Sequence, residues 1–161
     1  GYTKGVPMGA DLPKPPSPGT APSFLVAALK DPMSGNLDRI QIVKGGRGAD
    51  GQARGKIYEV AGGDAVRRRR GAEGRMPPGG DTVDVANATW TDTIGDASLT
   101  AVWSDPEFDP SQRAFYYARA IEIPTPRWTA YDALRFGIEM SPDVPMKQQE
   151  RAWSSPIWYA P

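Results

Sequence analysis

The sequence predicts a mainly β protein, an antiparallel β-sandwich with long Gly/Pro-rich loops and at most one or two short helices. Short segments alternate apolar and polar residues, and turn residues separate them. The chain also holds 18 glycines and 17 prolines in 161 residues, a composition that favours turns over long helices. Several short alternating strands between turns are typical of a sandwich or a barrel.

Residues 1–22 form a Pro-rich leader that contains "DLPKPPSPGTAP". Such a segment is extended, with polyproline-like stretches. We favour a linker or a strap over a ligand for a proline-recognition module. Residues 23–161 have the length of one domain, so we expect a single sandwich-like domain there.

The first strands follow from short apolar patterns. Ser23–Leu29 reads "SFLVAAL", a short apolar run that turn residues close, as in a buried strand. Ile40 and Ile42 then alternate with polar neighbours. Asp50-Gly51 is a hairpin signal. We therefore predict a β-hairpin over residues 37–61.

Residues 62–81 show no periodicity and predict an exposed, flexible loop. Three further strands are expected at 82–90, 97–105 and 113–124, because each segment alternates at least in part. The last of these, "RAFYYARAIEIP", carries the strongest strand pattern in the chain.

A short helix is predicted from Thr129 to Phe136, with Gly137 ending it. The final strand spans 152–160, "AWSSPIWYA". Pro156 lacks an N–H group, so this strand is expected at a sheet edge or broken at the proline.

Arg119 is unusual because alternation places it among apolar residues of its strand. One face, predicted to point into the core, carries Phe115, Tyr117, Ile121 and Ile123. A buried guanidinium needs a partner, and Asp84 or Asp92 could supply a carboxylate. We favour this structural role; the alternative is that Arg119 presents its fork to an anionic ligand.

The chain has no cysteine and no histidine. Disulfides, thiolate nucleophiles and a Ser–His–Asp triad are therefore excluded, and a metal site would need oxygen ligands alone. Asp105, Glu107 and Asp109 alternate in "SDPEFDPSQ" and are weak metal candidates. We favour ordinary turns there, and expect no cofactor in this chain.

Lysine plus arginine number 19, as do aspartate plus glutamate, so the formal net charge is zero. This balance argues against a nucleic-acid or membrane partner. "RRRR" at 67–70 could grip phosphate or RNA, but a solvated loop tip is the simpler interpretation.

Five tryptophans could form a binding platform if exposed or core if buried, and we favour core. The candidates for a binding or interface role are Arg119, Trp128, Trp153, Trp158 and Tyr159. No pair of acidic residues is singled out for carboxylate catalysis, although an enzyme of that kind is a third possibility.

Three segments of the last third of the chain resemble the C-terminal part of a bacterial family known as domain of unknown function 3604. They are "DPEFDPSQRAFYYARAIEIPTPRW", "TAYDALRFG" and "QERAWSSPIWYAP". Upstream pieces such as "GNLDRIQIVKG" are similar in the same order. Residues 45–81 depart from the family pattern, with Gly45-Gly46-Arg47, Gly62-Gly63 and the "RRRR" loop.

Members of that family are longer than this chain, and their N-terminal parts resemble metal-dependent phosphoesterases of the polymerase-and-histidinol-phosphatase superfamily. No catalytic motif of that superfamily can be carried over, because this chain lacks histidine. The resemblance implies a non-catalytic C-terminal accessory domain of a larger metal-dependent hydrolase. Its partner would be an upstream catalytic barrel or a second copy of the chain. The alternative is a stand-alone module that binds carbohydrate or protein through an aromatic face.

Overall fold

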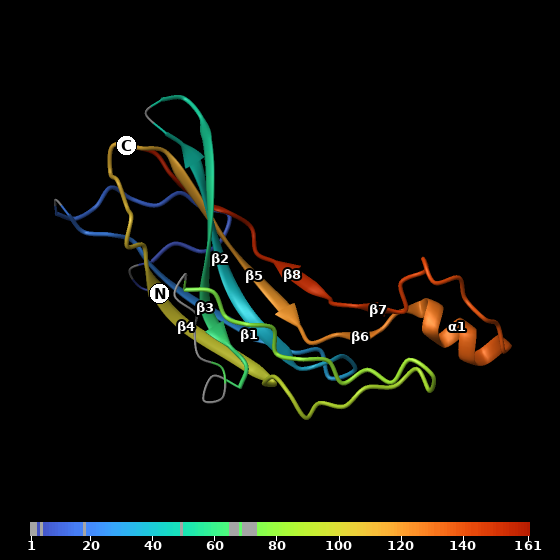
Figure 1. Cartoon of the computed structure of the whole chain (residues 1–161). Helices are drawn as coiled ribbons and strands as arrows, with labels where there is room; N and C mark the ends of the chain where they lie inside the picture. Colours follow the sequence, from blue (N-terminus) through green and yellow to red (C-terminus); the bar gives the residue numbers. More distant parts are fainter. Residues whose placement is uncertain (1–2, 4, 18, 49, 65–67, 69–73) are drawn as a thin grey trace.

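The computed structural model describes residues 3, 5–17, 19–48, 50–64, 68 and 74–161 (Figure 1). Its main element is a five-stranded antiparallel sheet in the order β3-β2-β5-β8, with β9 also paired to β5. The strands are β2 (Leu37–Arg47), β3 (Ala53–Gly62), β5 (Ala114–Glu122), β8 (Arg151–Trp153) and β9 (Ile157–Tyr159). A two-stranded antiparallel sheet, β1 (Ser23–Leu29) with β4 (Ser98–Ser104), packs on one face, which we call the inner face. The mainly β, sandwich-like prediction is confirmed.

Two apolar clusters join the layers. One contains Phe24, Ile42 and Tyr116, and the other contains Leu37, Ile40 and Leu99. Because β1 and β4 are only two strands, they leave part of the inner face uncovered. An open groove of about 620 Å³ remains there, beside β1, with Ala118 and Ala120 of β5 among its lining residues.

The predicted hairpin is confirmed as β2 and β3. Ile40 and Ile42 are buried on the inner face, as their alternation indicates. Gly51 has φ +78° in the turn, a left-handed conformation that suits glycine. A register shift after Ile40 marks a bulge, where the pairing moves by one residue.

The predicted facing of β5 is wrong. Tyr116, expected on the solvent side, is 1% exposed and belongs to the core. Arg119 lies on the opposite face. The reason is the register: Ala118 pairs with Ile42 and Ala120 with Ile40, so the even-numbered residues of β5 share the inner face with the two buried isoleucines.

The strand predicted at 82–90 is not formed. The segment instead makes a turn closed by one bridge between Asp84 and Thr89. The Asp84 side chain accepts hydrogen bonds from the backbone N–H and the amide of Asn87, and Ala88 has φ +49°. A side chain that satisfies the backbone locally competes with strand pairing.

The C-terminal segment is broken at Pro156, as expected, into β8 and β9. The leader reaches this end of the sheet and straps it. Leu12 N donates to Trp158 O (2.7 Å), Trp158 N donates to Ala10 O (3.0 Å) and Gly9 N donates to Pro156 O (3.0 Å).

Residues 125–148 form a projection that we call the arm. It comprises the pair β6 (Thr125–Pro126) and β7 (Lys147–Gln148), the helix α1 (Trp128–Phe136) and the loop after it. Figure 1 shows α1 standing away from the packed sheets. The helix prediction is confirmed to within one residue, with Gly137 ending it at φ +62°. Of the described helices, none has the length and apolar character to cross a membrane.

The expected solvated "RRRR" tip is wrong for Arg68, while Arg67, Arg69 and Arg70 lie outside the described residues. The Arg68 side chain is 8% exposed and lies 2.8 Å from Asp38 Oδ1. Its guanidinium also donates to the backbone oxygens of Asp38 and Gly63, each at 3.0 Å. Of the loop predicted at 62–81, residues 65–67 and 69–73 lie outside the described residues.

Candidate functional site

The face of the five-stranded sheet opposite β1 and β4 gathers most of the candidate residues, and we call it the open face. Directly paired residues on antiparallel strands point to the same side of a sheet. The register pairs Glu59 with Gln41, Gln41 with Arg119, and Arg119 with Trp153. These four residues therefore form one row across β3, β2, β5 and β8.

Hydrogen bonds run along this row. Gln41 Nε2 donates to Glu59 Oε1 at 2.8 Å, and the Gln41 amide oxygen accepts from Arg119 Nε (2.8 Å) and Nη2 (2.5 Å). Gln41 and Glu59 are 7% and 8% exposed, and Arg119 is half-buried. Glu59 fixes the orientation of the amide, and the amide in turn fixes the guanidinium.

Arg119 has no carboxylate partner among the described residues. The expected acids are engaged elsewhere: Asp84 with Asn87, and Asp92 with Lys30 and Asn36. A guanidinium carries five N–H donors, and the bonds to Gln41 use two of them. Arg119 is thus anchored at one edge of its fork and keeps donors for another group.

Trp153 is 59% exposed and flanks Arg119. Hydrogen bonds at Ala118–Ser154 and Glu122–Glu150 show that Arg119–Trp153 is a non-hydrogen-bonded pair, the kind in which side chains stand closest. Arg151, two residues before Trp153, is exposed on the same face opposite Ile121. No side-chain partner of Arg151 occurs in the described part of the chain.

Aromatic residues continue the open face toward the other end of β5. The rings of Phe115 and Tyr117 stack with centroids 6.4 Å apart, and Phe115 contacts Trp158 at 5.3 Å. Trp158 is 48% exposed. Gly45, opposite Phe115, has no side chain, and a Cβ there would lie 2.2 Å from the ring. Glycine at this position lets the Phe115 ring lie flat on the sheet.

Where β2 and β3 meet the 76–77 segment, the charged side chains of the open face pair with one another. Arg39 pairs with Asp38 and Glu59, and Arg68 pairs with Asp38. Arg39 also donates to the backbone oxygens of Met76 (2.8 Å) and Pro77 (3.2 Å), which fastens the 76–77 segment. Two guanidiniums and two carboxylates balance there. Arg119 and Arg151 have no such carboxylate partner among the residues that the structure describes.

The weak metal candidates do not converge on one point. Asp105 Oδ2 accepts from Lys44 Nζ (2.6 Å) and Tyr116 Oη (2.7 Å) on the inner face. Glu107 pairs with Lys56 and accepts from Tyr58 Oη (3.0 Å). Asp109 caps its own turn through Ser111 and Gln112. In the residues the structure describes, no three acidic side chains are grouped to hold a metal ion.

These acids shift the pKa values of two tyrosines. Burial, followed by the hydrogen bond to Asp105, raises the pKa of Tyr116 well above its usual range. Burial and then Glu107 raise the pKa of Tyr58 in the same way. Lys56 is the first cause of the lowered pKa of Glu107. Both tyrosines stay neutral and donate hydrogen bonds to the carboxylates, and these contacts stabilise the fold.

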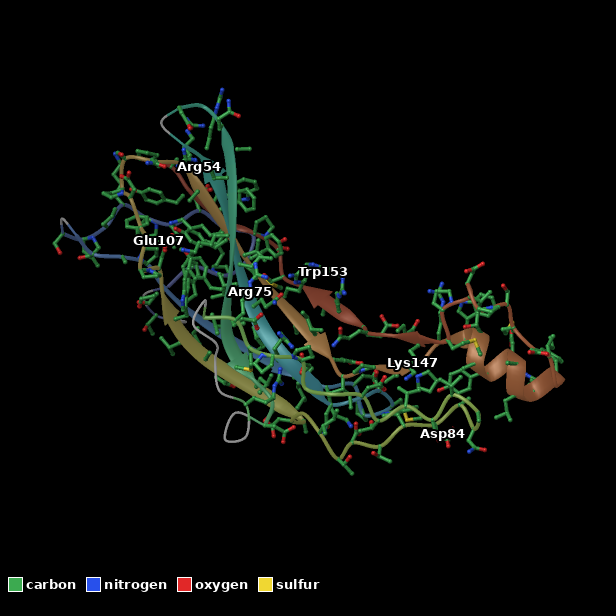
Figure 2. The ribbon with its side chains drawn as sticks, in the orientation of Figure 1. Arg54, Arg75, Asp84, Glu107, Lys147 and Trp153 are labelled. Carbon is green, nitrogen blue, oxygen red and sulfur yellow. The ribbon has the colours of Figure 1, made fainter. Side chains whose placement is uncertain are left out.

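The other predicted residues lie elsewhere. Tyr159 is 4% exposed, donates to Pro110 O (2.9 Å) and packs edge-on against Phe108, so it belongs to the core. Trp128 is 61% exposed on the arm. The expectation of a tryptophan core is wrong for Trp128, Trp153 and Trp158, although Trp103 packs on Phe24 and Tyr58. Figure 2 shows Trp153 on β8, outside the arm.

Sequence reasoning missed Gln41 and Glu59, which position Arg119. A usable signal existed for Gln41. It lies between Ile40 and Ile42, so strand alternation already placed it on the face opposite the core. Glu59 had no comparable signal, because its place beside Gln41 depends on the bulge in the hairpin.

A comparison with protein families finds one that matches residues 1–161, described as "Protein of unknown function (DUF3604)". The chain belongs to this family. No curated protein and no solved structure matches it. For this DUF3604 chain, the candidate site is therefore defined by the open face alone: the row Glu59–Gln41–Arg119–Trp153, Arg151 and the aromatic strip beside them.

Proposed function

We propose that this chain is a non-catalytic C-terminal accessory domain of a larger, metal-dependent hydrolase, and that it docks on the catalytic domain through the arm. The catalytic partner in this proposal is an upstream metal-dependent barrel, which the resemblance to longer DUF3604 proteins implies. The arm supplies the single observation that carries the proposal: it exposes large apolar side chains on a helix that stands apart from the sandwich.

Five apolar residues of the arm are 44% to 64% exposed: Trp128, Tyr131, Leu134, Phe136 and Ile138. Trp128, Tyr131 and Leu134 follow one another at three-residue spacing, which places them along one stripe of α1. Only Thr129 and Ala130 of the helix are buried. An exposed apolar patch of this kind marks a protein–protein contact surface.

The helix also needs support that the sandwich does not give. It has nine residues, and helices this short are marginal in water without tertiary packing. The ion pair Lys147–Asp81 (2.7 Å) ties the base of the arm to the 81–96 segment. The arm is thus held at its base, and its apolar stripe is left for a partner.

The arrangement of ionisable groups supports a non-catalytic role. Asp105 and Glu107 are each bound by a lysine and a tyrosine, and these partners hold the two carboxylates in place. A general base has to reach a substrate with a free lone pair. Asp105 is fully buried, and its oxygens accept from Lys44, Tyr116 and the Glu107 N–H.

The test is complementation in trans. The segment matching this chain is deleted from a longer DUF3604 protein, and this chain is added back to the remainder. We expect the two pieces to bind and the metal-dependent hydrolysis of a phosphoester to recover. Leu134→Glu should weaken binding by about tenfold or more, which corresponds to about 1.4 kcal/mol.

Val102→Glu is the matched control, because Val102 is also an exposed apolar residue (72%) but lies on β4, away from the arm. It should bind like the unchanged chain. If the remainder hydrolyses the phosphoester fully by itself and does not bind this chain, the accessory role is wrong.

A stand-alone binding module is the second candidate, and the open face favours it. Trp153 and Trp158 are both about half exposed on that face, beside Phe115 and Tyr117. If the chain binds a ligand through these residues and does not bind the remainder of the longer protein, the module is the better description.

A further inference from the structure

We infer that the open face binds an acidic oligosaccharide, a short chain of sugars with ring carboxylates. Arg119 would hold one carboxylate, with Trp153 stacked on the sugar ring that carries it. This ligand site is independent of the arm and goes beyond the accessory role.

The charge on the open face points to an anion. Arg119 and Arg151 lie on adjacent strands, and neither has a carboxylate partner in the part of the chain that the structure describes. The nearest acid in the row, Glu59, is separated from Arg119 by Gln41 and already accepts from Gln41 and Arg39. A half-buried guanidinium with only an amide partner is complementary to an anionic group from outside.

Arg119 is also pre-organised for such a group. Gln41 holds its Nε and Nη2, and Glu59 holds Gln41, so the plane of the guanidinium is set before a ligand arrives. Ordering a long side chain on binding costs free energy, and in this protein Gln41 already orders the Arg119 side chain before a ligand binds. The free donors of a fixed planar fork match the two oxygens of a carboxylate.

The aromatic neighbours favour a sugar over a small free anion. Trp153 is the direct cross-strand partner of Arg119 and offers a broad apolar surface on which the C–H groups of a pyranose ring can pack. Trp158 lies opposite Phe115, four residues from Arg119 along β5, a separation of about 13 Å. A chain of sugars can contact both tryptophans, whereas one sugar ring contacts only one.

The direct test is calorimetric titration of the full chain with oligogalacturonates of defined length. We expect binding to a tri- or tetramer, weaker binding to galacturonate monomer, and none to neutral cello-oligosaccharides of equal length. Because an ionic contact contributes, added sodium chloride should lower the affinity.

Variants locate the site. Arg119→Met should weaken binding about tenfold or more, since hydrogen bonds to charged groups contribute about 1.5–3 kcal/mol. Arg119→Lys keeps the charge without the fork and should also weaken it. Trp153→Ala should reduce the affinity for the trimer several-fold. Arg54→Gln is the control: Arg54 is an exposed arginine of the same sheet, paired with Asp50, and its loss should leave the affinity unchanged.

Three outcomes would overturn the inference. One is no binding of any oligogalacturonate at millimolar concentration; another is equal binding of cello-oligosaccharides. The third is equal or tighter binding of a glutamate-rich peptide, which would assign the face to a protein partner. Thermal melts of each variant show whether it is folded, and Arg119→Lys replaces Arg119→Met if the latter is not. Failure here leaves docking through the arm untouched, since the two tests use different surfaces.

Discussion

The two faces of the large sheet carry polar groups that are satisfied in different ways. On the inner face, Asp105 has a fully buried side chain and accepts from Lys44, Tyr116 and the backbone N–H of Glu107. On the open face, Arg119 bonds only to the neutral amide of Gln41, and Glu59 Oε2 has no hydrogen-bond partner in the described structure.

This difference separates structural charges from charges available for binding. A buried ion that is fully paired holds the fold together, and removing one partner leaves the other uncompensated. A half-buried ion with spare donors contributes less to stability and is open to a ligand. Mutations in the inner cluster, formed by Asp105, Lys44 and Tyr116, should therefore strongly lower the free energy of unfolding. Mutations of Arg119 should mainly weaken ligand binding.

The largest effect is expected at Asp105. Asp105→Asn keeps the shape but removes the charge that Lys44 and Tyr116 depend on, and should lower the free energy of unfolding by about 3–5 kcal/mol. Urea denaturation measures it. Asp109→Asn, in an exposed turn, is the control and should cost about 1 kcal/mol or less. Equal effects of the two variants would contradict a structural inner cluster.

An intermediate effect is expected at alkaline pH. Burial and carboxylate partners raise the pKa values of Tyr58 and Tyr116 in the folded protein. The unfolded chain ionises its tyrosines near pH 10, so stability is complete below about pH 10 and declines as the pH rises above it. Tyr116→Phe should make this decline shallower in urea titrations.

Tyr131→Phe is the control for the alkaline experiment, because Tyr131 is 44% exposed on α1. It should leave the slope of stability against pH unchanged. Phenolate absorbance of the unchanged protein should show tyrosines that ionise only as the chain unfolds. If the stability of Tyr116→Phe declined with pH as steeply as that of the unchanged protein, the raised pKa of Tyr116 would be contradicted.

The smallest effect is expected at Arg119. Arg119→Met keeps an apolar stem against the sheet and should change the free energy of unfolding by about 1 kcal/mol or less. Arg39→Met should cost clearly more, because it removes the guanidinium that pairs with two buried carboxylates, Asp38 and Glu59. If the two variants were equally destabilising in urea, Arg119 would be a structural arginine and the contrast between the faces would fail.

The secondary structure was largely readable because local patterns specify it. Ile40 and Ile42 alternate with polar residues, Gly137 ends the helix and Pro156 breaks the last strand, and each of these signals lies within a few residues. At 82–90 the pattern failed, because Asp84 and Asn87 satisfy the backbone within a turn.

The facing of β5 and the candidate site were not readable in the same way. Both faces of β5 carry aromatic residues, so alternation alone cannot tell which face is core. The register with β2 decides it, and pairing Ala118 with Ile42 puts Tyr116 inside. The partner of Arg119 is 78 residues away along the chain, and only this register brings Gln41 next to it.

The leader strap gives the sheet a mechanical property. Residues 9–12 run parallel to β9, and β9 is bonded in turn to β5. A force that pulls the chain before Gly9 away from the chain after Tyr159 acts along these two parallel strands. It therefore loads in shear the three hydrogen bonds that join residues 9–12 to Pro156 and Trp158. Bonds loaded in shear share the force and fail together, whereas bonds loaded end-on open one after another. Under tension the leader and the last strand act as a clamp.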